Sequence, residues 1–467
     1  MNKQEFLWGS ASSGPQSEGF FDKCNKSIWD EWFIKEPQRF HNYIGPDKTC
    51  DVYNNYATDA KLMQEIGLNS FRTSIQWTRV ISNFETGEIC QDGIEFYREY
   101  FKSLNDAGVK VIVNLFHYDM PFELHEQYGG FLSREVVDKF VEYAKVCFDH
   151  FDDQVYLWTT FNEPMAYAKE MYHDNRIFPC ELDFDKMMLV NYNVVYANAL
   201  CKQLYASRSY KQKMGIILDC QPSMPRSTRS ADLEAANIAD LLTNKIYLNP
   251  CILGEYSADY FDFIKDNNIK VNILKADLEV IKNNTMDFVG INYYRPTRVK
   301  APTFLPNPKV PMQLDHFFEK YDLPNCRMNN YRGWEIYPKA IYDIGVRIKD
   351  EYNNIEWFIS ENGMGVEDEE RFRDSAGIIQ DDYRIEFIKE HLYWLKKTRD
   401  EGSNCFGYHT WTFIDNWSWL NAFKNRYGYV EYNLTTGERK RKASSYWIEE
   451  LIKNEYMTKG DNNDINQ

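Results

Sequence analysis

Short stretches rich in strand-forming residues recur along the whole chain and alternate with stretches of helical pattern. Most of them lack strict apolar–polar alternation, which is typical of strands buried on both faces of a parallel sheet. Eight strand–helix units in series predict an α/β fold of the closed (β/α)8 (TIM) barrel type, not an open doubly wound sheet. The predicted strands are FLWGSA at Phe6, SFRTSIQW at Ser70, KVIVNLFH at Lys110, VYLWTTFNEP at Val155, KMGIILDC at Lys213, MDFVGINYY at Met286, EWFISENG at Glu356 and CFGYHTWTF at Cys405.

The helical segments between these strands have recognisable ends. Residues 51–67 and 93–108 carry apolar residues at helical spacing and stop at glycine, a common C-cap. Residues 133–151 open with serine, a favoured N-cap, and residues 336–352 carry a proline near their start. Residues 300–331 contain five prolines and are expected to form a long surface loop.

The length and composition set the class of protein. The 467 residues are 43% hydrophobic, enough for a large core, and barrels of this type can exceed ~400 residues as one unit. No linker or internal repeat divides the chain, so we expect a single domain over residues 1–467. The polar end, from about residue 458, is predicted to be disordered.

Charge and cysteine usage narrow the partners and the compartment. A net charge of −16 argues against a nucleic-acid binder, and no apolar window is long enough to predict a membrane span. The 10 cysteines form no C-x-x-C pair and no zinc-finger spacing. We expect reduced cysteines in a cytoplasmic protein without a secretory signal, and leave a homo-oligomer open.

Polar side chains stand where several predicted strands end. Catalytic groups of such barrels lie at the carboxyl ends of the strands, so these side chains are expected to share one mouth. They are His117, Glu163, Asn292, Tyr294 and Glu361.

Two glutamates at one mouth suit glycoside hydrolysis. One carboxyl group donates a proton to the leaving oxygen while the other attacks the anomeric carbon. Arg72, almost alone in an apolar strand, is expected to keep one of them ionised, with the Tyr294 hydroxyl as a second donor. Each residue taken singly also fits a structural role: a glutamate in a solvated loop, an arginine in a buried ion pair, or a histidine in the core.

Other catalytic motifs do not occur in the sequence. There is no phosphate-binding G-x-x-x-x-G-K-[ST] loop, no H-E-x-x-H zinc motif and no G-x-S-x-G nucleophile elbow, and the G-x-G of NGMGVED lacks a third glycine. We therefore predict no metal and no cofactor.

The chain resembles glycoside hydrolase family 1 from FLWGSASSGPQSEG at Phe6 to SSYWIEELI at Ser444. TFNEP around Glu163 matches the acid/base motif of the family, and ISENG around Glu361 matches its nucleophile motif. The resemblance implies a (β/α)8 barrel and a retaining double displacement without cofactor. In it, Glu163 acts as general acid and then general base, and Glu361 forms the covalent glycosyl-enzyme.

The resemblance also implies roles for other residues. Trp411 matches the platform under the sugar, and Trp334 resembles an aromatic residue on the aglycone side. A tyrosine, Tyr118, replaces the usual tryptophan after the histidine of strand three. The sugar-holding residues would be Gln16, His117, Asn162 and Asn292, and the nucleophile contacts Arg72 and Tyr294.

One departure bears on the substrate. Ordinary β-glucosidases of this family carry DNFEW, whose glutamate binds the sugar 4- and 6-hydroxyls, whereas this chain has DNWSW with Ser418 at that position. The branch that acts on 6-phosphoglycosides resembles this, with Ser, Lys and Tyr around the phosphate. Ser418 and Tyr427 match that pattern, but the lysine position holds Asn425, which leaves Lys424 or Arg426 as the cation.

The sequence therefore predicts a 6-phospho-β-glucosidase whose partner is a small phosphorylated β-glucoside. An unphosphorylated β-glucosidase and a 6-phospho-β-galactosidase remain alternatives within the family. A transglycosylase and a non-catalytic sugar-binding barrel are alternatives of other classes.

Overall fold

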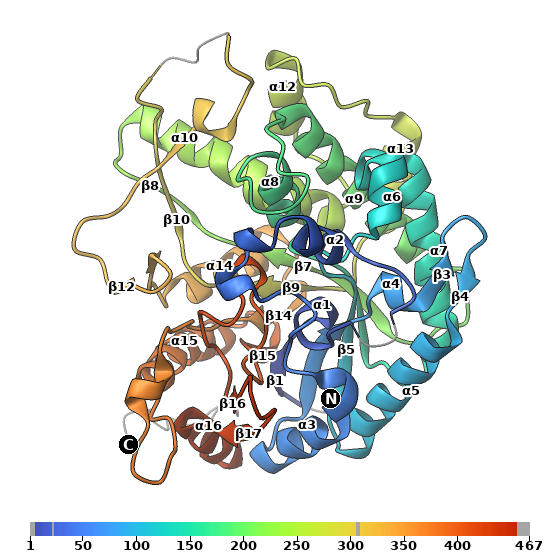
Figure 1. The fold of residues 1–467 in the computed structure, drawn as a ribbon. Helices are drawn as coiled ribbons and strands as arrows, with labels where there is room; N and C mark the ends of the chain where they lie inside the picture. Colours follow the sequence, from blue (N-terminus) through green and yellow to red (C-terminus); the bar gives the residue numbers. More distant parts are fainter. Residues whose placement is uncertain (1–4, 21–22, 305–308, 455–467) are drawn as a thin grey trace.

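The centre of the molecule is a closed barrel of eight parallel strands (Figure 1). The structure is a computed structural model that describes residues 5–20, 23–304 and 309–454. The strand order is β1-β15-β14-β9-β7-β6-β5-β2, and β1 closes the ring by pairing with both β15 and β2. These strands are the eight that the sequence predicts: β1 (Leu7–Ala11), β2 (Ser70–Ser74), β5 (Lys110–Phe116), β6 (Leu157–Asn162), β7 (Lys213–Asp219), β9 (Phe288–Asn292), β14 (Glu356–Glu361) and β15 (Cys405–Trp411).

The barrel strands are buried along almost their whole length. Every residue of β1, β2, β6, β9 and β15 is buried, which accounts for the missing polar alternation in their sequences. Inside the barrel, space is short: a Cβ added to Gly9 would lie 2.2 Å from His409 Nε2 of the neighbouring strand. The interior is therefore a packed core, and the open end of the barrel is left for chemistry.

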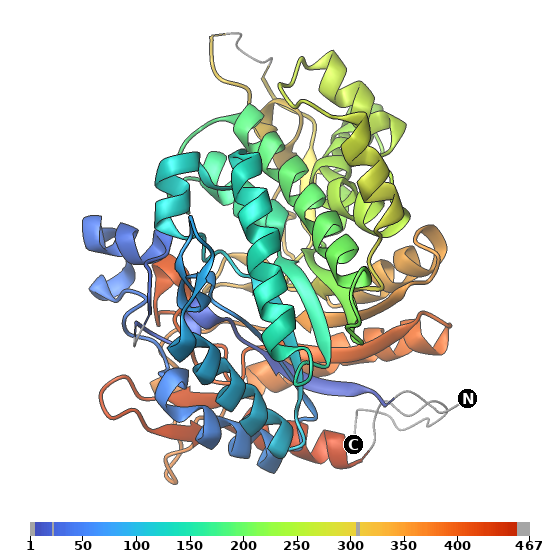
Figure 2. The same ribbon diagram turned by 90° about the vertical axis from the view of Figure 1, so that its right-hand side faces the viewer.

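Helices surround the barrel, as Figures 1 and 2 show from two directions. Helix α3 ends at Gly67 in the left-handed conformation, as predicted, and α7 begins after Ser133, whose hydroxyl accepts a hydrogen bond from the Glu135 N–H at 3.1 Å. The longer outer helices are α2 (Ile28–Lys35), α3 (Val52–Ile66), α5 (Gln91–Asp106), α7 (Arg134–Phe151), α8 (Pro164–Tyr172), α9 (Phe184–Ala206), α10 (Ser230–Asp240), α12 (Ala258–Asp266), α13 (Lys275–Asn283), α14 (Ala340–Glu351), α15 (Asp382–Asp400) and α16 (Ala443–Lys453).

The described part of the proline-rich segment 300–331 is mostly loop, and it also contains short strands. Its start extends β10 (Thr297–Lys300), which pairs with β8 (Ser223–Pro225) and β11 (Glu319–Lys320) in a small sheet. Further on, β12 (Met328–Asn329) and β13 (Trp334–Glu335) form a short hairpin. Strands of two to four residues are too short to show a periodicity, so the sequence did not reveal them; residues 305–308 of this segment lie outside the described residues.

The expectation that all cysteines are reduced is wrong for one pair. Cys24 and Cys90 form a disulfide with their Cα atoms 6.7 Å apart, although they are 66 positions apart in the sequence. Both lie beside the segment after β2: the Asn25 N–H donates to the Thr78 carbonyl at 3.0 Å, and the Cys90 N–H donates to the Val80 carbonyl at 2.8 Å. Only this tertiary meeting brings the two thiols together; the other eight cysteines are free.

Two further expectations concern membranes and the end of the chain. Within the described ranges, no helix is both long enough and apolar enough to cross a membrane. The predicted disorder from about residue 458 falls outside the described residues.

Candidate active site

Two glutamates face one cavity at the carboxyl ends of the barrel strands. Glu163 follows the last residue of β6 and Glu361 is the last residue of β14. Both line a cavity of about 180 Å³. The other predicted residues that line it are Gln16, His117, Asn162, Tyr294, Trp334, Trp411, Ser418 and Tyr427.

Donors hold both oxygens of Glu361. The guanidinium of Arg72, on β2, forms a close ion pair with Oε1 through Nη2, and the Tyr294 hydroxyl donates to Oε2 at 2.6 Å. Arg72 is fully buried and Glu361 is 5% exposed, so little water competes for these bonds. Charge-assisted hydrogen bonds of this kind stabilise the ionised carboxylate and fix its direction.

The surroundings of Glu163 have the opposite effect. Asn292 Nδ2 donates to Oε1 at 2.7 Å and the Tyr118 hydroxyl donates to Oε2 at 3.0 Å, but no cation contacts this carboxyl group among the described residues. Burial raises the pKa of Glu163 well above its ordinary value, and the negative charges of Asp219 and Glu361 raise it further. The neutral, proton-carrying form of Glu163 is therefore favoured.

The backbone at Glu163 is held in an unusual conformation. Its φ is 44°, in the left-handed region, and it precedes α8, which begins with Pro164. Tyr118, which contacts Glu163, also has a positive φ of 68°. Non-glycine residues with such backbones cost free energy and concentrate at functional sites, where the surrounding fold imposes them.

The two carboxyl groups lie in contrasting environments. Glu361 accepts hydrogen bonds from an arginine and a tyrosine, whereas burial and neighbouring negative charge favour the protonated form of Glu163. Such a contrast lets one group attack while the other supplies a proton at the same pH.

A buried polar network continues from the glutamates along the cavity wall. Arg72 Nη1 lies 3.2 Å from His117 Nδ1. Burial lowers the pKa of His117 well below its ordinary value, and the charge of Arg72 lowers it further, so the ring is neutral. Its Nε2 lies 3.2 Å from Asn162, and Asn162 accepts a hydrogen bond from Asn292 at 3.1 Å.

Aromatic rings line part of the cavity. Trp411 stacks on the His117 ring with centroids 6.1 Å apart, and Trp419 stacks on Tyr118 at 5.5 Å. Trp334 lies 5.5 Å from the ring of Tyr294. Flat faces next to hydrogen-bonding groups suit a sugar ring, which has apolar faces and a polar edge.

Comparison with known proteins identifies the family. The model of the family "Glycosyl hydrolase family 1" matches residues 2–457. The chain belongs to glycosyl hydrolase family 1. This confirms the predicted family and, with the closed barrel, the predicted fold, and it makes the protein a glycoside hydrolase.

Relatives of this family 1 enzyme cover nearly its whole length. The 6-phospho-beta-glucosidase GmuD of Bacillus subtilis (strain 168) is 47% identical over 451 residues, 96% of this chain and 97% of the relative. A 6-phospho-beta-galactosidase of Clostridium acetobutylicum is 33% identical over 96% of each chain. The solved family 1 β-glucosidase of Thermotoga maritima superposes with a TM-score of 0.87 at 30% identity, over 97% of this chain and 98% of the other.

The segment after β15 brings Ser418 and Tyr427 to the cavity of this enzyme. Ser418 is 9% exposed and Tyr427 4% exposed, and neither hydroxyl bonds to any residue in the described ranges. Gly365 makes room for the tyrosine, because a Cβ there would lie 2.3 Å from Tyr427 Cζ. Both hydroxyl groups are therefore placed at the cavity with hydrogen-bonding capacity unused.

The two cations predicted from the sequence lie elsewhere. The ammonium of Lys424 is 3.3 Å from Glu367 and its side chain is 41% exposed. Arg426 Nη1 donates to the carbonyl of Tyr432 at 3.3 Å. Among the described residues that line the cavity, neither is present.

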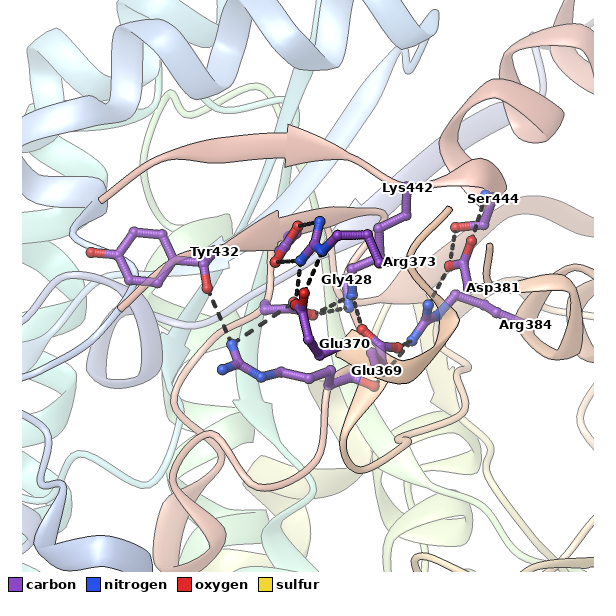
Figure 3. Close-up of polar contacts among 12 residues, drawn as sticks. Glu369, Glu370, Arg373, Asp381, Arg384, Gly428, Tyr432, Lys442 and Ser444 are labelled. Atoms are coloured by element: carbon purple, nitrogen blue, oxygen red, sulfur yellow. Dashed lines mark hydrogen bonds and ion pairs between the residues drawn. The ribbon is translucent and has the colours of Figure 1, made fainter. Parts of the chain in front are cut away.

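A buried ion network fixes the two ends of this segment (Figure 3). Lys442, fully buried, donates to Glu369 at 2.5 Å and to Asp415 Oδ1 at 2.9 Å, and the same oxygen accepts the Gly428 N–H at 2.8 Å. Arg384 donates to the other oxygen of Glu369 at 2.7 Å. Because Asp415 and Gly428 flank the segment, the network holds its start and end together.

Sequence reasoning missed several residues at this cavity. Asp219 is the last residue of β7, so the strand-end rule that found the two glutamates also applies to it. Trp419 neighbours Ser418 in the same motif but carries no signal of its own. The arginines at the cavity, which come from loops, are Arg176, Arg295 and Arg332.

Proposed function

We propose that this glycoside hydrolase cleaves the β-glycosidic bond of 6-phospho-β-glucosides with retention of configuration. The observation that carries the proposal is the pair of unbonded hydroxyls, Ser418 and Tyr427, on the cavity wall where β-glucosidases of the family are expected to have a carboxylate. The 47% identity with a relative named 6-phospho-beta-glucosidase supports it.

In the first chemical step, Glu361 attacks the anomeric carbon as the bond to the leaving oxygen breaks. Glu163 gives its proton to that oxygen, and a covalent glycosyl-enzyme forms. In the second step Glu163, now ionised, takes a proton from water as the water oxygen attacks the same carbon and releases Glu361. Two inversions give overall retention, and the chemistry needs no group beyond those of the chain and water.

The other residues orient these groups. Tyr294 and Arg72 hold Glu361 in line, and Asn292 fixes Glu163. His117, Asn162 and Gln16 are proposed to bind the hydroxyls of the sugar over the Trp411 face. The amide of Gln16 is itself held, accepting from Ser13 at 2.8 Å and donating to the Trp417 carbonyl at 2.9 Å.

Charge explains why a serine suits the phosphate. A carboxylate ~4 Å from one phosphate charge would raise the energy by about 4 kcal/mol at an effective dielectric constant of ~20. The Ser418 hydroxyl avoids that repulsion and offers a donor to a phosphate oxygen.

The test compares p-nitrophenyl β-glucoside with its 6-phosphate. We expect kcat/KM to be at least about 100-fold higher for the phosphorylated compound, and a preference for the unphosphorylated one would reject the proposal. The 6-phosphogalactoside is the matched third substrate, because a relative named 6-phospho-beta-galactosidase is 33% identical and the 4-hydroxyl decides between the two. NMR of the first product formed should show the β-anomer.

A phosphorylated substrate also favours a location in the cytoplasm, because a phosphate dianion does not cross a lipid bilayer unaided. We propose that the enzyme acts there on sugars phosphorylated during uptake. Fractionation of cells that express the tagged chain tests this location.

A further inference from the structure

Arg332 stands at the cavity on the turn between β12 and β13. Its guanidinium carbon lies 4.4 Å from the centre of the Trp334 ring, a distance at which a cation and an aromatic face attract each other. The side chain is half-buried. The fold thus holds a permanent positive charge at a cavity that Glu163 and Glu361 also line.

Arg332 contacts Asn425, the residue at the position where the family resemblance predicts a lysine. Its Nη1 donates to Asn425 Oδ1 at 3.1 Å, and Asn425 is 2% exposed. The guanidinium, which comes from the turn between β12 and β13, therefore lies against the amide of residue 425. A cation therefore does lie beside residue 425, and it is supplied by a residue 93 positions away in the chain.

Two donors at this contact have no partner. Arg332 Nε and Asn425 Nδ2 are both buried, and neither has a hydrogen-bond partner among the described residues. Buried donors are rarely left unpaired, and Arg332 lines the same cavity as the free hydroxyls of Ser418 and Tyr427, which together indicate a bound acceptor. A tetrahedral anion with several oxygens fits a guanidinium, an amide and two hydroxyls.

The pKa of Tyr427 is affected by the nearby charge of Arg332. Burial raises the pKa of the Tyr427 hydroxyl, and among the charged groups that act on it Arg332 is the strongest in the opposite direction. Arg176 and Arg295, the other cavity arginines, lie beside carboxylates: Arg176 is 3.9 Å from Glu170, and Asp219 raises the pKa of Arg295 against the lowering by burial. Their charges are partly compensated already.

We propose that Arg332 is the cation that binds the 6-phosphate of the substrate, in place of a lysine at position 425. This assignment rests on the proposed phosphoglycosidase function. It makes the β12–β13 hairpin a specificity element, and it explains why neither Lys424 nor Arg426 needs to turn towards the cavity.

The test is the ratio of kcat/KM for p-nitrophenyl β-glucoside 6-phosphate to kcat/KM for p-nitrophenyl β-glucoside. Arg332→Met should lower that ratio by about 10- to 100-fold, since it removes a charge-assisted contact made only to the phosphorylated substrate. It should also weaken competitive inhibition by glucose 6-phosphate more than inhibition by glucose. Arg332→Lys, which keeps the charge, should recover part of the ratio.

Two further variants make the result specific. Arg327→Met removes an arginine near the same hairpin that pairs with Glu390 at 2.5 Å, and it should leave the ratio within about threefold. Asn425→Lys placed in the Arg332→Met background returns a cation to the opposite side and should restore most of the ratio.

The outcomes separate this assignment from the proposed function. If the wild-type enzyme prefers the phosphorylated substrate but Arg332→Met keeps the ratio within threefold, Arg332 is not the phosphate cation and the proposed function stands. An equal loss on both substrates also overturns the assignment, because Arg332 would then act on the fold or the aglycone. A wild-type preference for the unphosphorylated substrate overturns the proposed function itself.

Discussion

Replacing Ser418 with glutamate should lower kcat/KM for phosphorylated substrates. The side chain lies at the cavity wall, 9% exposed, with a hydroxyl that no described residue engages. One carboxylate charge ~4 Å from one phosphate charge costs about 4 kcal/mol at an effective dielectric constant of ~20, which corresponds to about a 10³-fold loss in kcat/KM. The positive charge of Arg332 compensates part of this, so we expect a loss of about 10²- to 10³-fold.

The matched control is Ser418→Gln, because glutamine has nearly the same size as glutamate but carries no charge. Both variants are assayed with p-nitrophenyl β-glucoside 6-phosphate and with the unphosphorylated glucoside. The charge effect is the difference between Glu and Gln on the phosphorylated substrate, and kcat/KM for the unphosphorylated one should not fall in parallel. Equal losses for Glu and Gln would show that size alone matters and would refute the electrostatic reasoning.

Three further variants test the catalytic and structural reasoning. Glu361→Gln should reduce turnover by about 10⁴-fold or more while inhibition constants for glucose 6-phosphate stay similar, and surviving turnover would contradict the nucleophile role or any hydrolytic mechanism built on it. Asp219→Asn removes one of the charges that raise the pKa of Glu163, so Glu163 should lose its proton at lower pH. The alkaline limb of the pH profile of kcat/KM should therefore move to lower pH. A limb that stays in place or moves to higher pH would contradict the assignment of Glu163 as the acid. Lys442→Met should lower the free energy of unfolding by about 3–5 kcal/mol in urea titrations, because it removes the nearest cation of the buried Asp415 and leaves Glu369 with Arg384 alone. A loss below about 1 kcal/mol would speak against the network.

The pH dependence of stability is a second test of the ion network around Lys442. Burial alone would raise the pKa of Glu369, but the charges of Lys442 and Arg384 outweigh it and lower that pKa from 4.5 to about 2. The unfolded chain then binds the proton first, so this contribution is complete above about pH 4.5 and is lost as the pH falls towards 2. Lys442→Met should flatten the fall in unfolding free energy over that window, and an unchanged slope would assign the acid sensitivity to other groups.

The position of the two glutamates at the cavity could be predicted because it follows a local rule. A parallel barrel strand buries both faces, so its sequence is largely apolar, and a charged residue at its carboxyl end stands out in the chain. Glu163 and Glu361 stand out for that reason, and Asp219 would have stood out under the same rule. The contrast between the two glutamates was expected in outline only, because burial and neighbouring charge have no signature in sequence.

Other features depend on segments that are distant in the sequence but lie next to each other in the structure. The disulfide between Cys24 and Cys90 arises because both ends pack against the segment after β2, and spacing in the chain carries no trace of that. The short strands of segment 300–331 are below the length at which periodicity shows. The positions of Lys424 and Arg426, beside Glu367 and the Tyr432 carbonyl, depend on how one turn folds.

The sequence by itself determined the barrel, the family, the two carboxyl groups and the exchange of a carboxylate for Ser418. These follow from local patterns: strand periodicity, strand ends and short motifs whose residues lie together in the chain. Only the tertiary structure decided which groups surround those carboxyls and which cation stands beside residue 425. Arg332 reaches Asn425 from a hairpin 93 residues away, and such a contact is fixed by the packing of loops around the barrel mouth, which no local pattern encodes.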